Sequence, residues 1–265
     1  MQNQVKSREW DACAYQRVSG PQFSWGKKVL ARVSVRGDET VLDAGCGTGR
    51  LTRDLLELLP RGRVVGVDLS ENMLRAAQEQ LQDFHPRVKF VSADLQHLPF
   101  RESFDGIFST AAFHWVPDHD QLFRTLHGAL RPGGWLIAQC GGAGNLKRLL
   151  ERVAALCAIP KYAPYLASYR HSWVFSNPDE AAQRMRNAGF MDIETGLEET
   201  PTLFPDAQQY VEFISKVILH RHLERIPSAA IRQNLLDDLA ELAAKDDPPF
   251  LLDYWRLNVC GRRAQ

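Results

Sequence analysis

The stretch VLDAGCGTGRLT, residues 41–52, decides the fold. A short apolar run contains Asp43 near its end, three glycines follow at every second position, and leucines at helical spacing come next. Glycines at positions 45, 47 and 49 allow the backbone to turn sharply and to approach a ligand closely, because they carry no Cβ. The stretch therefore predicts a buried strand, then a ligand-binding turn, then a helix.

Strand-like and helix-like patterns alternate outward from this stretch, between about residues 28 and 140. This alternation predicts an α/β fold, with a parallel sheet that helices cover on both faces. In such a sheet ligands bind beyond the carboxyl ends of the strands, which is where the glycines lie. The further strands are expected at 63–68, 88–94, 104–110, 135–140, 191–200 and 251–263.

Three segments stand outside this pattern and are mostly helical: residues 1–30, 143–172 and 203–246. We expect them to be additions to a single domain over residues 1–265, and to form a helical lid above the glycine-rich turn. Another helix is predicted within SNPDEAAQRMRNAGF, where Asn177 and Glu180 have the spacing of a capping box.

Three successive predicted strands end in or near an aspartate: Asp43, Asp68 and Asp94. The carboxyl ends of parallel strands meet at one edge of the sheet, and a carboxylate after the second strand binds the ribose hydroxyls of adenosine ligands. A dinucleotide fingerprint would have glycine where Arg50 stands. The pattern thus favours an adenosine ligand without pyrophosphate, and an NAD-dependent oxidoreductase is the alternative.

The stretches VLDAGCGTG, VVGVDLSENMLRAA, VSADLQHLPF and LRPGG resemble the successive motifs of class I S-adenosylmethionine-dependent methyltransferases, over about residues 38–142. The resemblance implies a Rossmann-like, seven-stranded, mostly parallel sheet whose last strand is antiparallel, and S-adenosyl-L-methionine as cofactor. It implies that Asp68 binds the ribose and that Asp94 accepts from the adenine amino group. The cofactor-binding residues expected on this basis are Tyr15, Asp43, Gly45, Cys46, Gly47, Gly49, Asp68, Leu69, Met73, Asp94, Leu95 and Ser109.

A narrower resemblance lies in residues 108–145, which contain HWVPD after the fourth strand. This stretch is similar to the trans-aconitate methyltransferase group, and it implies O-methylation of a small carboxylate such as trans-aconitate. His114 and Trp115 are the catalytic candidates, as a base or hydrogen-bond donor and as an apolar wall, with structural packing as the alternative for both. The substrate candidates are Arg170, Tyr165 and Tyr169, with the HRH at 220–222 as a second set.

The amino-acid composition limits the kinds of molecule that the protein is expected to bind. Lys plus Arg and Asp plus Glu number 32 each, and the resulting zero net charge argues against binding to nucleic acid or to a membrane surface. The first ten residues lack the apolar region of a secretory signal, no run suits a membrane span, and the five cysteines lack zinc spacing. We therefore expect a cytoplasmic monomer or homodimer that acts on a small-molecule substrate without a metal.

Two further points concern the function class. A non-catalytic S-adenosylmethionine-binding subunit would share the same cofactor motifs, so it stays an alternative to an enzyme. The sequence DPPF at 247–250 has the spelling of the motif that holds nitrogen acceptors in amino-methyltransferases. Here it does not follow the fourth strand, and we interpret it as a turn.

Overall fold

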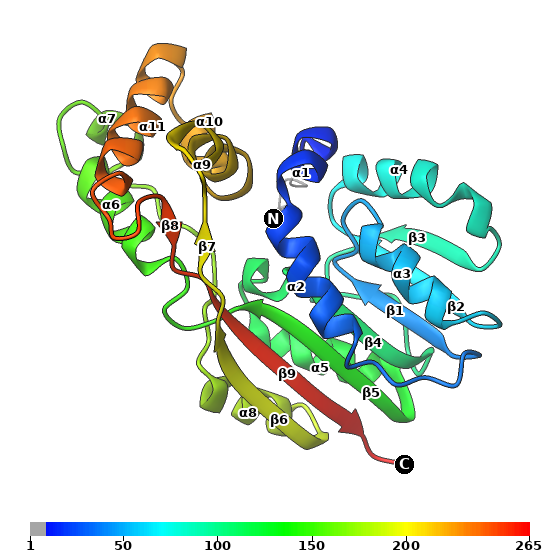
Figure 1. Cartoon of the computed structure of the whole chain (residues 1–265). Helices are drawn as coiled ribbons and strands as arrows, with labels where there is room; N and C mark the ends of the chain where they lie inside the picture. Colours follow the sequence, from blue (N-terminus) through cyan, green and yellow to red (C-terminus); the bar gives the residue numbers. More distant parts are fainter. Residues whose placement is uncertain (1–8) are drawn as a thin grey trace, which may run out of the picture.

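One seven-stranded sheet organises the chain (Figure 1), in a computed structural model that describes residues 9–265. The strand order is β3-β2-β1-β4-β5-β9-β6. Strands β1 to β5 pair in parallel, and β9 lies antiparallel between β5 and β6. This confirms the expected Rossmann-like sheet with its last strand reversed. The strands are β1 Thr40–Ala44, β2 Arg63–Asp68, β3 Val88–Ser92, β4 Phe104–Thr110, β5 Leu130–Gly141, β6 Phe190–Glu199 and β9 Trp255–Arg263.

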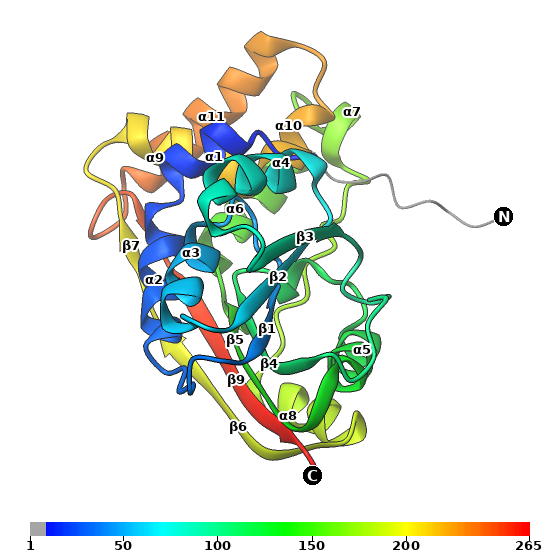
Figure 2. The same cartoon turned by 90° about the vertical axis from the view of Figure 1, so that its right-hand side faces the viewer.

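Helices cover both faces of the sheet (Figure 2). On one face α2 (Gly20–Leu30) and α3 (Arg50–Leu58) pack over a core that includes Val41, and on the other α5 (His119–Ala129) and α8 (Pro178–Asn187) pack over a core that includes Leu42. Neighbouring strand residues point to opposite faces, so both must be apolar in a doubly covered strand. The capping box of α8 is present as predicted, with Asn177 and Glu180 in their expected roles. Helices α1 (Ala12–Val18) and α4 (Glu71–Gln80) and the short turns η1 (Gln82–Phe84) and η2 (Phe113–Trp115) complete this part.

A second group of helices stands beyond one end of the sheet and has its own apolar core (Figure 1). We call this group the cap. The core is built on fully buried aromatic and aliphatic side chains such as Tyr162, Phe213 and Leu235. The cap comprises α6 Lys147–Cys157, α7 Ala163–Leu166, α9 Ala207–Phe213, η3 Ile214–Ile218, α10 His220–Glu224 and α11 Ala229–Ala243, and the two-stranded ribbon of β7 Thr202–Leu203 and β8 Leu251–Leu252 joins it to the sheet.

The structure departs from the predicted elements in two places that bear on the site. Within the mostly helical segment 203–246, helix α9 widens into a π-type turn, in which Leu219 N donates to Ile214 O at 2.7 Å. The strand expected over 251–263 breaks between β8 and β9. Periodicity cannot reveal either change, because a π turn inserts one residue into the helical repeat and both sides of the strand break are apolar.

Residues 246–250, which include DPPF, form a turn between α11 and β8, as predicted. Within residues 9–265, no helix combines the length and the apolar character that crossing a membrane requires. The expectation about a secretory signal concerns mainly residues 1–8, which lie outside the described residues.

Candidate functional site

The glycine-rich turn connects β1 to α3 in a conformation that only glycine adopts easily. Gly45 has φ of 85° and Gly47 has φ of 53°, both in the left-handed region. The amides of Gly45 and Cys46 donate to Val67 O at 2.8 and 3.0 Å, which ties the turn to β2. A Cβ at Gly47 would meet nothing within 4 Å, so the backbone there borders open space. A ligand can therefore approach this backbone directly.

Asp68 holds the turn and the next helix together at the end of β2. Its Oδ2 accepts from Gly47 N at 3.0 Å, and its Oδ1 accepts from Ser70 N at 2.9 Å. Ser70 in turn caps α4 by accepting from Met73 N at 3.3 Å. A carboxylate oxygen can accept more than one hydrogen bond, so Asp68 can still bind ribose hydroxyls.

Asp94 lies beyond the end of β3, at the same edge of the sheet. Its Oδ1 accepts from the backbone N of Gln96 at 2.9 Å, and both of its carboxylate oxygens accept from the Gln96 side chain. This arrangement orients the carboxylate at the rim of the site. Asp68 and Asp94 are the two acidic residues that line the cavity within the described part of the chain.

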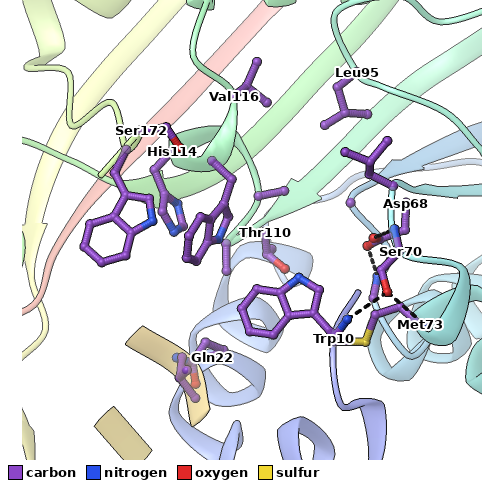
Figure 3. Close-up of a pocket in the computed structure, with 18 of the residues that line it drawn as sticks. Trp10, Gln22, Asp68, Ser70, Met73, Leu95, Thr110, His114, Val116 and Ser172 are labelled. Carbon is purple, nitrogen blue, oxygen red and sulfur yellow. Dashed lines mark hydrogen bonds between the residues drawn. The ribbon is translucent and has the colours of Figure 1, made fainter. Parts of the chain in front are cut away.

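A cavity of about 410 Å³ lies between this edge of the sheet and the cap, and Figure 3 shows part of its lining. It brings together residues from the sheet, from the N-terminal helices and from the cap, which are far apart in the sequence. The predicted site residues that line it are Tyr15, Gly45, Gly47, Asp68, Leu69, Met73, Asp94, Leu95, His114 and Trp115.

Four predicted cofactor residues support the turn without lining the cavity: Asp43, Cys46, Gly49 and Ser109. Asp43 is 3% exposed, and its Oδ2 accepts from Thr52 Oγ1 at 2.6 Å. Ser109 donates to Ala44 O at 2.6 Å, which fixes β4 against β1. Burial raises the pKa of Asp43 to about 7; the Thr52 hydrogen bond opposes this rise and the Asp68 charge adds to it. Asp43 therefore lies beneath the turn as a buried support.

The three predicted substrate residues do not line the cavity. Arg170 is exposed and donates to the carbonyl oxygens of Ala167 and Tyr169. Tyr165 packs on the cap core, and the Tyr169 ring contacts His222. The expectation that these three residues bind the substrate inside this cavity is therefore not met by their positions.

Three tryptophans instead form one wall of the cavity. Trp115 contacts Trp10 with ring centroids 5.6 Å apart and Trp173 with centroids 5.3 Å apart, both edge to face. They come from the N-terminal segment, from η2 and from the segment before α8. Such a wall excludes water and offers a large apolar surface to a ligand.

His114 is held in one tautomer by the backbone. The Gly141 amide donates to its Nδ1 at 3.2 Å. A ring nitrogen that accepts a hydrogen bond carries no proton, so neutral His114 has its proton on Nε2. This geometry favours the donor interpretation of His114 over the base interpretation.

Arg256 is the functional candidate that the sequence analysis missed. It lines the cavity, is 2% exposed, and has no hydrogen-bond partner for Nε and Nη2 within residues 9–265. Its Cζ lies 4.7 Å from the centre of the Trp25 ring. Burial lowers its pKa, although a guanidinium stays protonated at neutral pH. An arginine beside Leu257 and Val259, near the start of a strand that lies between two others, was the available signal.

Comparison with known proteins agrees with this geometry. A family model described as methyltransferase domain matches residues 41–134. A trans-aconitate 2-methyltransferase of Azoarcus sp. is 40% identical over 49% of this chain, and the match spans 50% of that relative. A protein of the same name from Deinococcus radiodurans is 29% identical over 83% of this chain and 84% of its own length. The match to the Azoarcus relative therefore spans only about half of the length of that protein.

A solved structure shares the fold. It is phosphoethanolamine N-methyltransferase 2 of Haemonchus contortus in complex with phosphomonomethylethanolamine and S-adenosylhomocysteine. The TM-score is 0.62 at 21% identity, and the alignment covers 96% of this chain and 57% of that one.

The lining residues fit S-adenosylmethionine. The open backbone at Gly47 gives room for the methionyl part, Asp68 suits the ribose hydroxyls, and Leu69 and Met73 offer an apolar surface for the adenine. The cofactor carries a positive sulfonium, which nearby carboxylates stabilise, and it has no pyrophosphate that would require backbone donors at a helix N-terminus.

Asp68→Asn is expected to weaken the binding of S-adenosylhomocysteine by about 10- to 100-fold, because hydrogen bonds to charged groups contribute ~1.5–3 kcal/mol. Isothermal titration calorimetry measures this. Asp83→Asn, at an exposed position outside the cavity, is the control and should bind like the wild type. Equal affinities for the Asp68 variant and the wild type would contradict the role of Asp68.

Asp43→Asn should change the pH dependence of the free energy of unfolding. The pKa of Asp43 is raised in the folded state from 3.8 to about 7, so its contribution to stability is complete below pH 3.8 and is lost as the pH rises through about 7. Asparagine stays neutral, so the variant should gain stability relative to the wild type between these values. Urea unfolding of both proteins between pH 3.8 and about 7 tests this prediction. A difference in the free energy of unfolding between variant and wild type that does not vary with pH would refute the raised pKa of Asp43.

Proposed function

We propose that this chain, which belongs to the class I S-adenosylmethionine-dependent methyltransferases and binds that cofactor, methylates a carboxylate oxygen of a small organic acid. The observation that carries the proposal is Arg256, a buried cation in the cavity with two unpaired nitrogens. The names of the trans-aconitate 2-methyltransferases point to the same class of acceptor. Trans-aconitate is the first acid to test.

The charges along the cavity are divided in a way that suits an anionic acceptor. The two carboxylates among the described lining residues lie on the cofactor side, where Asp68 ends β2 and Asp94 follows β3. The two arginines of the lining, Arg221 and Arg256, come from α10 in the cap and from β9. A buried guanidinium without a partner is costly, and a carboxylate that forms two parallel hydrogen bonds with it offsets the cost.

Arg256 and His114 are both connected to Gly141 at the carboxyl end of β5. Arg256 is the register partner of Gly141 in the antiparallel pair of β5 and β9, and the Gly141 amide donates to His114. Both residues are therefore located at the same end of the sheet, near the carboxyl ends of β4 and β5. Arg256 would supply a charged fork and His114 an Nε2–H donor to one acceptor.

A carboxylate acceptor also fits a site that has a donor histidine in place of a base. Carboxylic acids with ordinary pKa values near about 4 are ionised at neutral pH, so the nucleophile requires no proton removal. A phenol or an amine would require a base, and the tautomer of His114 does not favour that role.

In this mechanism the protein positions the reactants and excludes water. When bound, S-adenosylmethionine supplies an electrophilic methyl group on a positively charged sulfur. Gly45, Gly47, Asp68 and Asp94 would hold it, and Arg256 would orient the acceptor carboxylate. The indole wall of Trp10, Trp115 and Trp173 would keep the space between the cofactor and the acceptor apolar. Exclusion of water from this space favours methyl transfer to the aligned acceptor over reaction with solvent.

An assay that transfers a labelled methyl group tests the acceptor class directly. The panel should contain mono-, di- and tricarboxylic acids with trans-aconitate among them, together with phenols and primary amines. We expect label in the acids, as esters that are lost in mild base. Transfer to amines or phenols in preference to every acid would refute carboxylate methylation.

Arg256→Met should raise KM for the methylated acid and lower kcat/KM by roughly 10²-fold, because loss of one partner of a buried charge pair costs ~2–5 kcal/mol. Its affinity for S-adenosylhomocysteine should stay unchanged. Arg256→Lys retains the charge but not the fork, and it should be intermediate. Arg262→Met, at an exposed position of the same strand, is the matched control. Wild-type kinetics in Arg256→Met would exclude Arg256 from acceptor binding.

A further inference from the structure

Gln22 carries a buried acceptor without a donor. Its Oε1 is inaccessible to solvent and has no hydrogen-bond partner within the described residues, and the side chain lines the cavity. Among the lining residues that the structure describes, only Gln22 and Arg256 have such atoms. A buried amide oxygen without a partner is unfavourable, so the site is expected to receive a donor from a ligand.

The neighbours of Gln22 place it beside the glycine-rich turn. The Arg50 guanidinium lies 4.0 Å from the centre of the Phe23 ring, and a Cβ at Gly26 would lie 2.2 Å from Leu51 Cδ1. Arg50 and Leu51 form the first turn of α3, directly after Gly49. Helix α2 is therefore packed against the segment that follows the turn, and Gln22 directly precedes the first of these two contacts in the sequence.

This position is distinct from the nucleoside end of the cavity. Figure 3 shows Gln22 well apart from Asp68, Ser70 and Met73. The cofactor has an ammonium group and a carboxylate in its methionyl part, and this part belongs at the turn. The two acidic residues of the described lining, Asp68 and Asp94, lie at the ends of β2 and β3, whereas Gln22 Oε1 is a buried acceptor without a partner on the α2 side of the turn.

We propose that Gln22 is a cofactor-binding residue whose Oε1 accepts a hydrogen bond from the ammonium group of the methionyl part. The inference does not depend on the methyl acceptor. A half turn of the amide would instead present Nε2 to the methionyl carboxylate, and the two arrangements respond in opposite ways to a negative charge at residue 22.

Calorimetric titration with two ligands tests this role. S-adenosylhomocysteine contains the amino-acid part, and 5′-methylthioadenosine contains the same adenosine and sulfur without it. Gln22→Leu should weaken the binding of S-adenosylhomocysteine by about tenfold or more and leave that of 5′-methylthioadenosine within about twofold of the wild type. Gln22→Glu should bind S-adenosylhomocysteine at least as tightly as the wild type, because a carboxylate attracts the ammonium group.

Gln16→Leu on α1 is the matched control, since Gln16 is exposed and lies outside the cavity lining. It should bind both ligands like the wild type. Equal weakening of both ligands by Gln22→Leu would show a structural role and overturn the proposal. Weakening of S-adenosylhomocysteine by Gln22→Glu to the level of Gln22→Leu would overturn the ammonium contact. Because the readout is binding, failure of the carboxylate proposal would leave this result unaffected.

Discussion

The site depends on the two hydrogen bonds that the Asp68 carboxylate accepts from backbone amides. The carboxylate accepts from Gly47 N in the turn after β1 and from Ser70 N at the start of α4. One side chain thus fixes two loops that meet at the same edge of the sheet. A carboxylate bound by backbone amides has a fixed orientation, so the same group can bind ribose hydroxyls without reorganisation. The left-handed glycines let the turn come close enough for this bond to form.

Two separate apolar cores surround the cavity, and each controls a different part of its chemistry. The sheet cores hold the turn, Asp68 and Asp94 in place, while the cap core supports α10 and η3. The wide turn of η3 lets Val217 and Ile218 line the cavity while Ile214 stays in the cap core. In the proposed function, the sheet would bind the cofactor and the cap would help to select the acceptor.

The cavity is lined by two residues, Gln22 and Arg256, whose buried polar atoms have no hydrogen-bond partner within the described residues. Gln22 offers a buried acceptor atom, and Arg256 offers buried donor atoms with a positive charge. Unsatisfied polar atoms are rare in folded proteins because each of them costs free energy. In the two proposals, ligands provide the missing partners: a cationic amino group at the turn and an anionic acid at the end of β5.

The motifs of residues 41–140 allowed prediction of the sheet, the limits of β2 and β4, and the cofactor edge, whereas β5 begins five residues before its predicted start. Strands β2 and β4 begin and end where the apolar runs do, because a doubly buried strand requires continuous apolar residues and turns mark its ends. Local backbone chemistry explains this success, since glycine conformations, caps and strand ends depend on near neighbours. The same reasoning found Asp68 and Asp94, because parallel strands bring their carboxyl ends to one edge.

Most of the acceptor side of the cavity could not be predicted in this way, although the candidates His114, Trp115 and Arg221 do line the cavity. Arg170 matched the chemistry of a carboxylate clamp but does not line the cavity, whereas Arg256 does, in a strand that pairs with β5. Trp10, Trp115 and Trp173 come together only because three distant segments pack on one another. The sequence by itself determined the cofactor edge, since it is built from local turns in chain order. Only the tertiary structure decided which side chains face the acceptor, because that depends on long-range packing, which leaves no periodic pattern in the sequence.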